Sequence, residues 1–295
     1  MILGFSDYEQ QGRRLAEALD RPFELIHVHR FPDGESKVTV PAELPEQVIV
    51  CRSLNRPNDK LLELMLATET LRQHGAREIT LVAPYLCYMR QDIAFHPGEA
   101  VSQLIVGRFL SRLVDAVITV DPHLHRIDRL DQAVPGIPAM ALSCAPAMAG
   151  FLGKQSQTPM LIGPDGESEQ WVRAIAEPAG LDYAVATKER LGDRHVRVSL
   201  PPNGYGGREI VLVDDMTSTG QTLVEVATEL KARGAGPIHC LVTHALHEEA
   251  ATERLRGAGI EKIWSSDSIT HPSNAVRLDR LLAQAVRELE PQRNL

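Results

Sequence analysis

The 295-residue sequence lacks the features that mark several common classes of protein. No window reaches the ~18 uninterrupted apolar residues of a membrane span, and the start, MILGFSDYEQ, has no basic stretch followed by an apolar core. No sustained run of Lys and Arg occurs and the net charge is −8, so the electrostatic footprint of a nucleic-acid or polybasic membrane binder is missing. We therefore expect a cytoplasmic protein that binds neither nucleic acid nor membrane.

Cysteine is scarce, and its spacing matches no metal-binding or disulfide framework. Cys51, Cys87, Cys144 and Cys240 lie far apart, and none forms a CxxC pair. Three of them fall within apolar runs that are typical of strands, so we expect reduced core cysteines. No GxGxxG motif follows a first strand, which argues against a dinucleotide-dependent Rossmann enzyme.

Short apolar runs alternate with helical patterns along the chain. In the first half the runs at 48–51, 79–84 and 116–120 are separated by helical patterns at 58–74 and 99–114. This alternation predicts βαβ units and mainly parallel sheets flanked by helices, an α/β fold.

The same alternation resumes after about residue 145. It predicts strands at 159–163, 183–187, 210–215, 237–244 and 260–266, and helices at 168–179, 219–234 and 247–258. The stretch at 135–148, rich in Pro, Ala and Ser, is the expected boundary. We therefore predict an N-terminal domain over 1–142 and a C-terminal domain over 143–295. The latter ends in an amphipathic helix at 275–289, whose pattern leaves open which of the two domains it packs on.

The strongest local motif is IVLVDDMTSTGQT at 210–222, where an apolar strand runs into two acids and then a turn that opens a helix. Backbone N–H groups at such a helix start suit a phosphate dianion, and a glycine lets the backbone approach it closely. Asp214 and Asp215 fall at the carboxyl end of the strand, where open α/β sheets bind ligands. The alternative is that TSTG only caps a helix after a buried strand.

This motif resembles the phosphoribosyl-binding loop shared by type I phosphoribosyltransferases and ribose-phosphate pyrophosphokinases. Four segments of the first half resemble the pyrophosphokinases in particular, in their order and spacing: FPDGE at 31–35, RSLNRPNDKLLELM at 52–65, PYLCYMRQD at 84–92 and DPHLHR at 121–126. The resemblance implies two type I phosphoribosyltransferase domains, the first on the ATP side and the second binding ribose 5-phosphate. It also implies a homo-oligomer, either a dimer or a hexamer.

The resemblance assigns roles to residues of both domains. It implies contacts with ATP by Phe31, Asp33, Gly34, Glu35, Arg90, Gln91 and His123. It implies contacts with ribose 5-phosphate by Asp165, Asp214, Asp215, Ser218, Thr219, Gly220, Gln221 and Thr222. Without it, FPDGE is equally a surface turn, and Asp165 within GPDGES a turn residue.

Mg²⁺ is the cofactor that the resemblance implies, with His123, Asp165 and Asp121 as metal-binding residues. The pair His123 and His125 also suggests zinc, but no third Cys or His has a convincing spacing. Phosphate chemistry favours a hard cation with oxygen ligands.

Lys188 and Arg190 of TKER, at 187–190, match the mobile catalytic loop of the family and are the expected catalytic residues. The implied reaction moves the β,γ-diphosphate of ATP to the C1 hydroxyl of ribose 5-phosphate, giving 5-phosphoribosyl 1-diphosphate and AMP. The chain departs from the family at Ile93–His96, where basic residues are usual. Two alternatives remain open, a catalytically weak regulatory paralogue and a phosphoribosyltransferase.

Overall fold

The computed structural model describes residues 1–155, 158–190, 196–202 and 204–292, without the side chains of 188–190, 196–198 and 291–292. The chain divides into two compact units. The N-terminal unit comprises Met1–Ser143, Ser268–Thr270 and the segment that begins at Leu278; the C-terminal unit comprises Cys144–Asp267 and His271–Arg277. In the described part of the chain, no helix has the length and apolar character needed to cross a bilayer.

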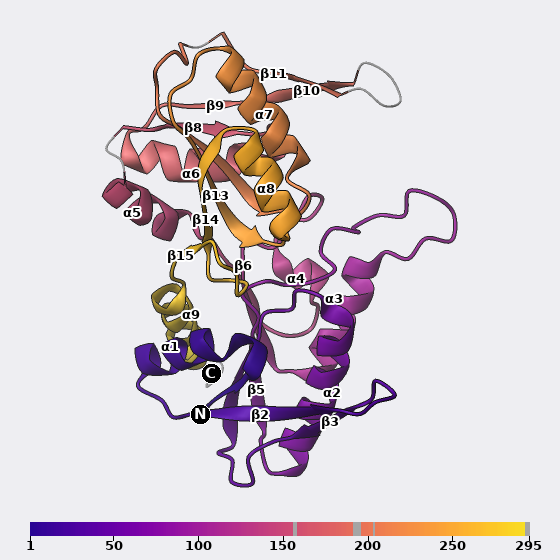
Figure 1. Cartoon of the computed structure of the whole chain (residues 1–295). Coiled ribbons are helices and arrows are strands. Elements are labelled where there is room, and N and C mark those ends of the chain that lie inside the picture. The colour runs from indigo at the N-terminus through magenta and orange to yellow at the C-terminus, as the bar shows by residue number, and fades with distance from the viewer. Residues whose placement is uncertain (156–157, 191–195, 203, 293–295) are drawn as a thin grey trace. The chain divides into compact units, whose positions relative to one another are not determined.

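The N-terminal unit is built on a sheet with the strand order β3-β2-β1-β4-β5-β6-β7 (Figure 1). Every neighbouring pair is parallel except β2 and β3, which form an antiparallel hairpin. The strands are β1 (Ile2–Phe5), β2 (Phe23–Arg30), β3 (Ser36–Thr39), β4 (Gln47–Cys51), β5 (Glu78–Val82), β6 (Ala116–Val120) and β7 (Ala139–Leu142). The central strands β1, β5 and β6 are buried except for Glu78 at the start of β5, as expected when helices cover both faces of a parallel sheet.

The helices of this unit pack their apolar sides on the sheet. They are the 3₁₀ turn η1 (Ser6–Tyr8), α1 (Glu9–Leu19), α2 (Pro57–Gln73), α3 (Ser102–Leu113), α4 (Leu130–Ala133) and α9 (Asp279–Gln292). The prediction that a helix begins at 99 is wrong by three residues. Glu99 instead accepts hydrogen bonds from the Phe95 backbone N–H at 2.7 Å and the His96 ring at 2.6 Å, which holds the preceding turn outside the helix.

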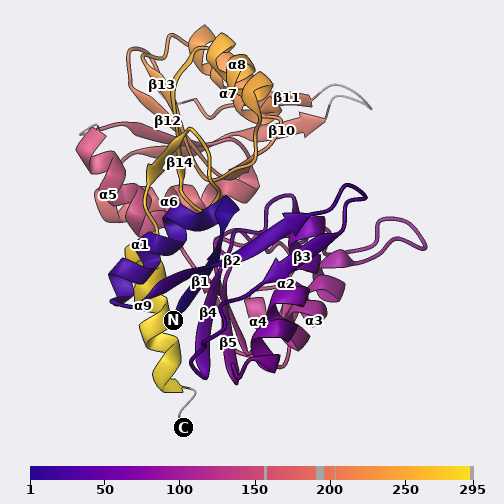
Figure 2. The same cartoon turned by 60° about the horizontal axis from the view of Figure 1, so that its bottom comes forward.

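The C-terminal helix α9 belongs to the N-terminal unit, not to the C-terminal domain predicted over 143–295. It lies beside α1 in both views (Figures 1 and 2). Glu290 makes a bidentate ion pair with Arg21, with N–O distances of 2.6 and 2.8 Å, and Arg287 donates to the Ala18 carbonyl at 2.5 Å. The amphipathic pattern predicts a helix here but not which core it covers.

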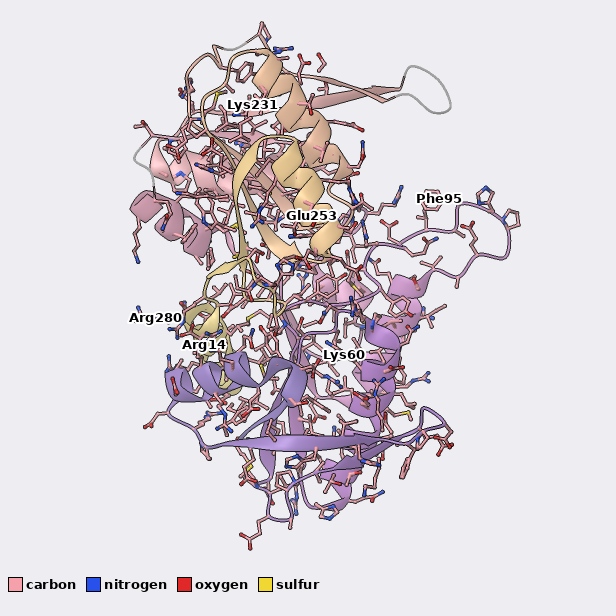
Figure 3. The ribbon with its side chains drawn as sticks, viewed as in Figure 1. Arg14, Lys60, Phe95, Lys231, Glu253 and Arg280 are labelled. Carbon is pink, nitrogen blue, oxygen red and sulfur yellow. The ribbon has the colours of Figure 1, made fainter. Side chains whose placement is uncertain are left out.

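A buried ion-pair network joins the ends of β1 and β4 to α2. Arg52, directly after β4, donates to Glu63 at 2.6 Å and to Asp7 at 3.1 Å, and the side chains of Arg52 and Glu63 are only 6% and 2% exposed. Lys60 of α2 (Figure 3) bonds Asp7 at 2.7 Å. Arg30 of β2 reaches Glu63 at 3.3 Å. The network therefore neutralises charges that would be costly to bury singly.

The C-terminal unit has a fully parallel sheet with the order β15-β14-β13-β12-β8-β9. Its strands are β8 (Met160–Gly163), β9 (Tyr183–Val185), β12 (Ile210–Thr217), β13 (Ile238–Ala245), β14 (Ile260–Ser266) and β15 (Asn274–Val276). A separate antiparallel ribbon consists of β10 (Thr187–Arg190) and β11 (Val196–Ser199), and it projects from the unit (Figure 1).

Helices cover both faces of this sheet as well. They are α5 (Ala145–Gln155), the 3₁₀ turn η2 (Gly166–Ser168), α6 (Glu169–Ala179), α7 (Gln221–Ala232) and α8 (Glu249–Gly257). The helix predicted from 275 begins at Asp279, because Asn274–Val276 pairs with β14 as a strand. The α/β fold with two mainly parallel sheets is confirmed.

His247 is buried directly beyond β13. It is 3% exposed, and its ring lies against that of His271 with centroids 4.4 Å apart. Burial, followed by the charge of His271, lowers the pKa of His247 to about 4. A neutral imidazole is therefore the form that the fold accepts.

The Arg52–Glu63 pair predicts the outcome of a single substitution. Glu63→Gln leaves the buried Arg52 guanidinium without its strongest partner, and we expect the free energy of unfolding to fall by about 3–5 kcal/mol. Glu69→Gln, an exposed change on the same helix, serves as the control. Urea unfolding followed by circular dichroism measures both, and equal stability of the two variants would contradict the structural role given to this network.

The lowered pKa of His247 predicts how acid affects stability. Its folded pKa lies below the unfolded value, so its contribution is present above about pH 6.5 and is lost as the pH falls toward 4. His247→Leu removes this dependence, so the unfolding midpoint of the variant should fall less between about pH 7 and about pH 5 than that of the wild type. His74→Leu, at an exposed histidine, should leave the slope unchanged.

Candidate functional site

Strand topology locates the ligand-binding edge of the C-terminal unit. From β8 the chain first adds β9 on one side and then returns to add β12 on the other, so the order reverses between β8 and β12. Ligands of open α/β folds bind outside the carboxyl ends of the strands at such a point. The segment GPDGES at 163–168 follows β8, and Asp214 and Asp215 lie near the end of β12.

Asp165 is held by a capping box at the start of η2. Its carboxylate accepts from the Ser168 backbone N–H at 3.3 Å, and its own N–H donates to Ser168 Oγ at 3.3 Å. Gly163 leaves room for this arrangement, because a Cβ there would lie 2.5 Å from Ser168 Oγ. The turn thus fixes the position of Asp165 before any ligand binds.

Asp165, Asp214 and Asp215 interact electrostatically. Burial raises the pKa of Asp214 well above its ordinary value, and the charges of Asp215 and Asp165 raise it further. Asp214 accepts a hydrogen bond from the Asp215 backbone N–H at 3.0 Å, which opposes the shift only in part. Like charges held together in this way favour a ligand that brings hydroxyl donors or positive charge, and carboxylate oxygens are the donors that Mg²⁺ prefers.

The phosphate segment, which we define as Thr217–Thr222, contains the predicted residues Ser218, Thr219, Gly220, Gln221 and Thr222. It runs from the end of β12 into the start of α7. Gly220 is the helix N-cap with φ +72°, a conformation that glycine adopts without strain. The N–H of Gln221, the first residue of α7, donates to Thr219 Oγ1 at the long distance of 3.4 Å, and N–H groups at a helix start suit a phosphate.

The predicted catalytic residues Lys188 and Arg190 lie on β10. Their backbones pair with Val198 and Val196 of β11. Their side chains, and residues 191–195 between the two strands, lie outside the described parts of the chain. The catalytic assignment therefore stays a prediction.

In the N-terminal unit an ion pair joins two of the predicted ATP-binding segments. Arg126, in the loop after β6, donates to both carboxylate oxygens of Asp92, in the loop after β5, at 2.7 and 2.9 Å. The Asp92 side chain is 3% exposed. PYLCYMRQD and DPHLHR, about 30 residues apart in sequence, thus form one edge of the sheet.

Two residues of these loops adopt left-handed backbone conformations that side chains rarely favour. Tyr88 has φ +61° and Asp121 has φ +37°. Asp121 is buried, and its N–H donates to the Leu142 carbonyl at 2.8 Å. Such strain persists only where the surroundings impose it, and it gathers at functional sites.

Arg90 and Gln91 lie in the same loop. Arg90 is exposed, and the Gln91 amide donates to the Ile93 carbonyl at 2.9 Å. In the stretch Ile93–His96 that follows, the Phe95 N–H donates to the Glu99 carboxylate. The Phe95 side chain is 63% exposed and points outward (Figure 3). The ATP-binding role of Arg90 and Gln91 stays a prediction.

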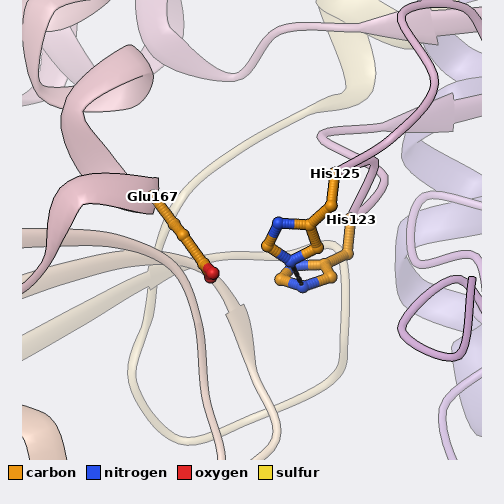
Figure 4. Close-up of side chains that lie close together, drawn as sticks. All are labelled: His123, His125 and Glu167. Carbon is orange, nitrogen blue, oxygen red and sulfur yellow. Dashed lines mark hydrogen bonds between the residues drawn. The ribbon is translucent and has the colours of Figure 1, made fainter. Parts of the chain in front are cut away.

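His123 and His125 lie against each other in the loop after β6 (Figure 4). Their ring centroids are 4.0 Å apart with planes inclined at 78°, and the two Nε2 atoms meet. Nitrogen atoms that converge in this way can also bind one cation, and the metal-binding role of His123 stays a prediction.

FPDGE forms the turn of the β2–β3 hairpin. The Phe31 N–H donates to the Glu35 carbonyl at 2.8 Å, Asp33 accepts from the Glu35 N–H at 3.1 Å, and Gly34 has φ +95°. Phe31 is 41% exposed, and its ring lies edge-on to His29. Among the described residues, the hydrogen bonds and ring contacts of FPDGE stay within 29–35, so nothing joins it to Arg90 or His123.

Other side chains position the loops of both units and were not predicted from the sequence. Arg126 fixes Asp92, while Arg254 and Leu255 of α8 contact the phosphate segment. Arg126 is the last residue of DPHLHR, so this motif could have drawn attention to it. Arg254 lies more than 30 residues beyond Gly220 on a helix without a motif, so no sequence pattern marks it.

Comparisons with known proteins agree with these features. The family described as "N-terminal domain of ribose phosphate pyrophosphokinase" matches residues 1–113, and the "phosphoribosyl transferase domain" matches residues 134–272. A ribose-phosphate pyrophosphokinase of Methanopyrus kandleri is 37% identical over 98% of this chain and 99% of its own length. Those of Methanosarcina acetivorans and Sulfolobus acidocaldarius are each 32% identical, covering 98% and 94% of this chain and 99% and 96% of their own lengths.

The fold also matches a solved structure. The crystal structure of phosphoribosylpyrophosphate synthetase from Mycobacterium smegmatis aligns with a TM-score of 0.85 over 99% of both chains, at 22% identity. This likeness shows that the fold is shared. Together with the relatives that match along nearly the whole chain, it establishes that this protein belongs to the ribose-phosphate pyrophosphokinase family.

Proposed function

We propose that the protein is a ribose-phosphate diphosphokinase that transfers the β,γ-diphosphate of ATP to ribose 5-phosphate. The observation that carries this proposal is the set of three aspartates, Asp165, Asp214 and Asp215, beside the phosphate segment at the switch point of a parallel sheet. The segment suits a 5-phosphate and the aspartates suit ribose hydroxyls. Family membership supplies the reaction in which such a sugar takes part.

In the proposed reaction the C1 hydroxyl oxygen of ribose 5-phosphate bonds to the β-phosphorus of ATP. The bond from that phosphorus to the oxygen bridging to the α-phosphate breaks, AMP leaves with the bridging oxygen, and the hydroxyl proton passes to solvent. The charge in such a transition state is spread over phosphate oxygens, so the protein acts mainly by positioning and electrostatics. Lys188 and Arg190 are proposed to bear this charge.

The remaining residues bind and orient. The phosphate segment holds the 5-phosphate, and Asp214 and Asp215 accept hydrogen bonds from ribose hydroxyls. In the N-terminal unit, Arg90, Gln91 and His123 bind ATP phosphates, whereas the residues of FPDGE contact adenine and ribose. FPDGE is proposed to serve the site of a neighbouring subunit in a dimer or hexamer, which accords with the separation of its contacts from the other two segments.

Mg²⁺ is the proposed cofactor. The carboxylate of Asp165 in the C-terminal unit, and the carboxylate of Asp121 and the imidazole of His123 in the N-terminal unit, are each suitable donors. When bound, the ion neutralises charge on the diphosphate oxygens. The cytoplasmic location also stays a proposal, in keeping with four cysteines that are all free and buried.

A ³¹P NMR time course with ATP, Mg²⁺ and ribose 5-phosphate tests the reaction. AMP and a sugar-linked diphosphate should appear, and Lys188→Ala should lower the rate by about 100-fold to 1000-fold with a smaller effect on ATP binding. A loss below about tenfold would remove Lys188 from the catalytic role. If the wild type produces no AMP, the protein is instead a regulatory paralogue; release of diphosphate that depends on a nucleobase would identify a phosphoribosyltransferase.

Asp214→Asn should separate stability from activity. The folded pKa of Asp214 lies above the unfolded one, so its ionisation destabilises the fold increasingly as the pH rises above about 4. Without ligands, the variant should therefore unfold at higher urea than the wild type at neutral pH, with a smaller difference at acid pH, while its synthesis of product falls by about 100-fold. Asp182→Asn, which removes an exposed carboxylate of the same unit, should do neither. A destabilised Asp214→Asn variant would contradict the raised pKa of Asp214 described here.

A further inference from the structure

Helix α8 contacts the phosphate segment through two side chains. Arg254 Nη2 donates to the Thr219 carbonyl at 2.9 Å. The next residue, Leu255, lies beneath Gly220, since a Cβ built on Gly220 would be 3.2 Å from Leu255 Cγ and Cδ2. Two successive residues of one helix thus hold the same turn of the segment.

The Arg254 bond determines which way one peptide group faces. In a trans peptide the carbonyl oxygen of Thr219 and the N–H of Gly220 point in opposite directions. When Arg254 holds the carbonyl toward α8, the Gly220 N–H is directed away from α8. The glycine conformation at φ +72° gives this peptide group freedom to rotate that other residues would lack, so an external anchor matters here.

Three carbonyls of the segment are each held by a group of the protein. Thr217 O accepts from the Leu246 N–H at 2.9 Å, Gly220 O accepts from the Val224 N–H at 3.0 Å, and Thr219 O accepts from Arg254. A carbonyl oxygen directed at a phosphate would repel it, whereas N–H groups attract it. Of these three anchors, Arg254 is the one formed by a side chain, so it is the one that substitution can remove.

We propose that Arg254 is a positioning residue for the 5-phosphate of ribose 5-phosphate, acting through the Thr219–Gly220 peptide group rather than by contact with the substrate. This inference rests on the proposed role of the phosphate segment in binding ribose 5-phosphate. Loss of the anchor lets the peptide rotate and present an oxygen in place of an N–H. The cost falls on substrate binding, because the 5-phosphate takes no part in bond making.

A nearby arginine provides a control that distinguishes this role from general attraction of the phosphate by positive charge. Arg256 lies two residues further along α8 and is exposed, as Arg254 is. Among the described residues it makes no side-chain hydrogen bond or ion pair with the phosphate segment. Arg256→Ala therefore removes the same charge from the same helix while leaving the anchor intact.

The test uses the full-length protein with three variants: Arg254→Ala, Arg254→Lys and Arg256→Ala. The dissociation constant for ribose 5-phosphate is measured by calorimetry, and KM and kcat are measured for both substrates. Arg254→Ala should weaken binding of ribose 5-phosphate by about 10-fold to 100-fold, the range of a hydrogen bond from a charged group, and change the KM for ATP by less than about twofold. Arg254→Lys should recover part of the affinity, since an ammonium can still donate to the carbonyl, and Arg256→Ala should match the wild type.

Three outcomes would overturn the inference: equal losses in Arg254→Ala and Arg256→Ala, full recovery in Arg254→Lys with a loss in Arg256→Ala, or an equal change in the KM values for ATP and ribose 5-phosphate. If Arg254→Ala does not fold, as judged by circular dichroism, the affinities of Arg254→Lys and Arg256→Lys for ribose 5-phosphate are compared instead. Equal affinities would then overturn the inference. A wild type that binds ribose 5-phosphate but forms no AMP would overturn the proposed function alone, because the calorimetric comparison still tests Arg254. A wild type that fails to bind ribose 5-phosphate would overturn both.

Discussion

Repulsion among carboxylates at the ends of β8 and β12 is the constraint on which the C-terminal site depends. Asp165 is fixed by the turn that caps η2, and Asp214 and Asp215 are fixed by a buried parallel strand, so none can move away freely. Burial raises the pKa of Asp214 well above its ordinary value, and the charges of Asp215 and Asp165 raise it further. The sheet supplies the stability that keeps these charges together, and a ligand with hydroxyl donors or positive charge relieves the repulsion. The site is thus prepared for binding at a cost to the unliganded fold.

In the N-terminal unit, the edge where the strand order reverses carries charges of both signs. Its strand order reverses at β1 and β4, where Asp7 and Arg52 follow the two strands and bind each other. Opposite charges occupy this edge and neutralise one another, so we assign it a structural role. The strained loops lie instead beyond β5 and β6, joined by the pair of Arg126 and Asp92. The two sheets therefore differ in the signs of the charges where their strand orders reverse.

The sequence predicted regular elements well where their pattern was self-contained. The strands at 116–120 and 260–266 have the predicted bounds, because each is a short apolar run with polar flanks. The strands β1, β2, β3 and β7 were not predicted, since their burial alternates or their runs are short. The start of α3 and the strand β15 were also misjudged, because one depends on the side chain of Glu99 and the other on pairing with β14.

By itself the sequence determined the α/β class, the phosphate segment and the membership of each motif in one family, because these depend on residues that are neighbours in the chain. Only the tertiary structure decided that α9 covers the N-terminal unit, that Asp165 lies close enough to raise the pKa of Asp214, and that Arg254 faces Thr219. Each of these joins segments distant in sequence. Local patterns record what a residue prefers, whereas packing of the whole chain determines which residues meet.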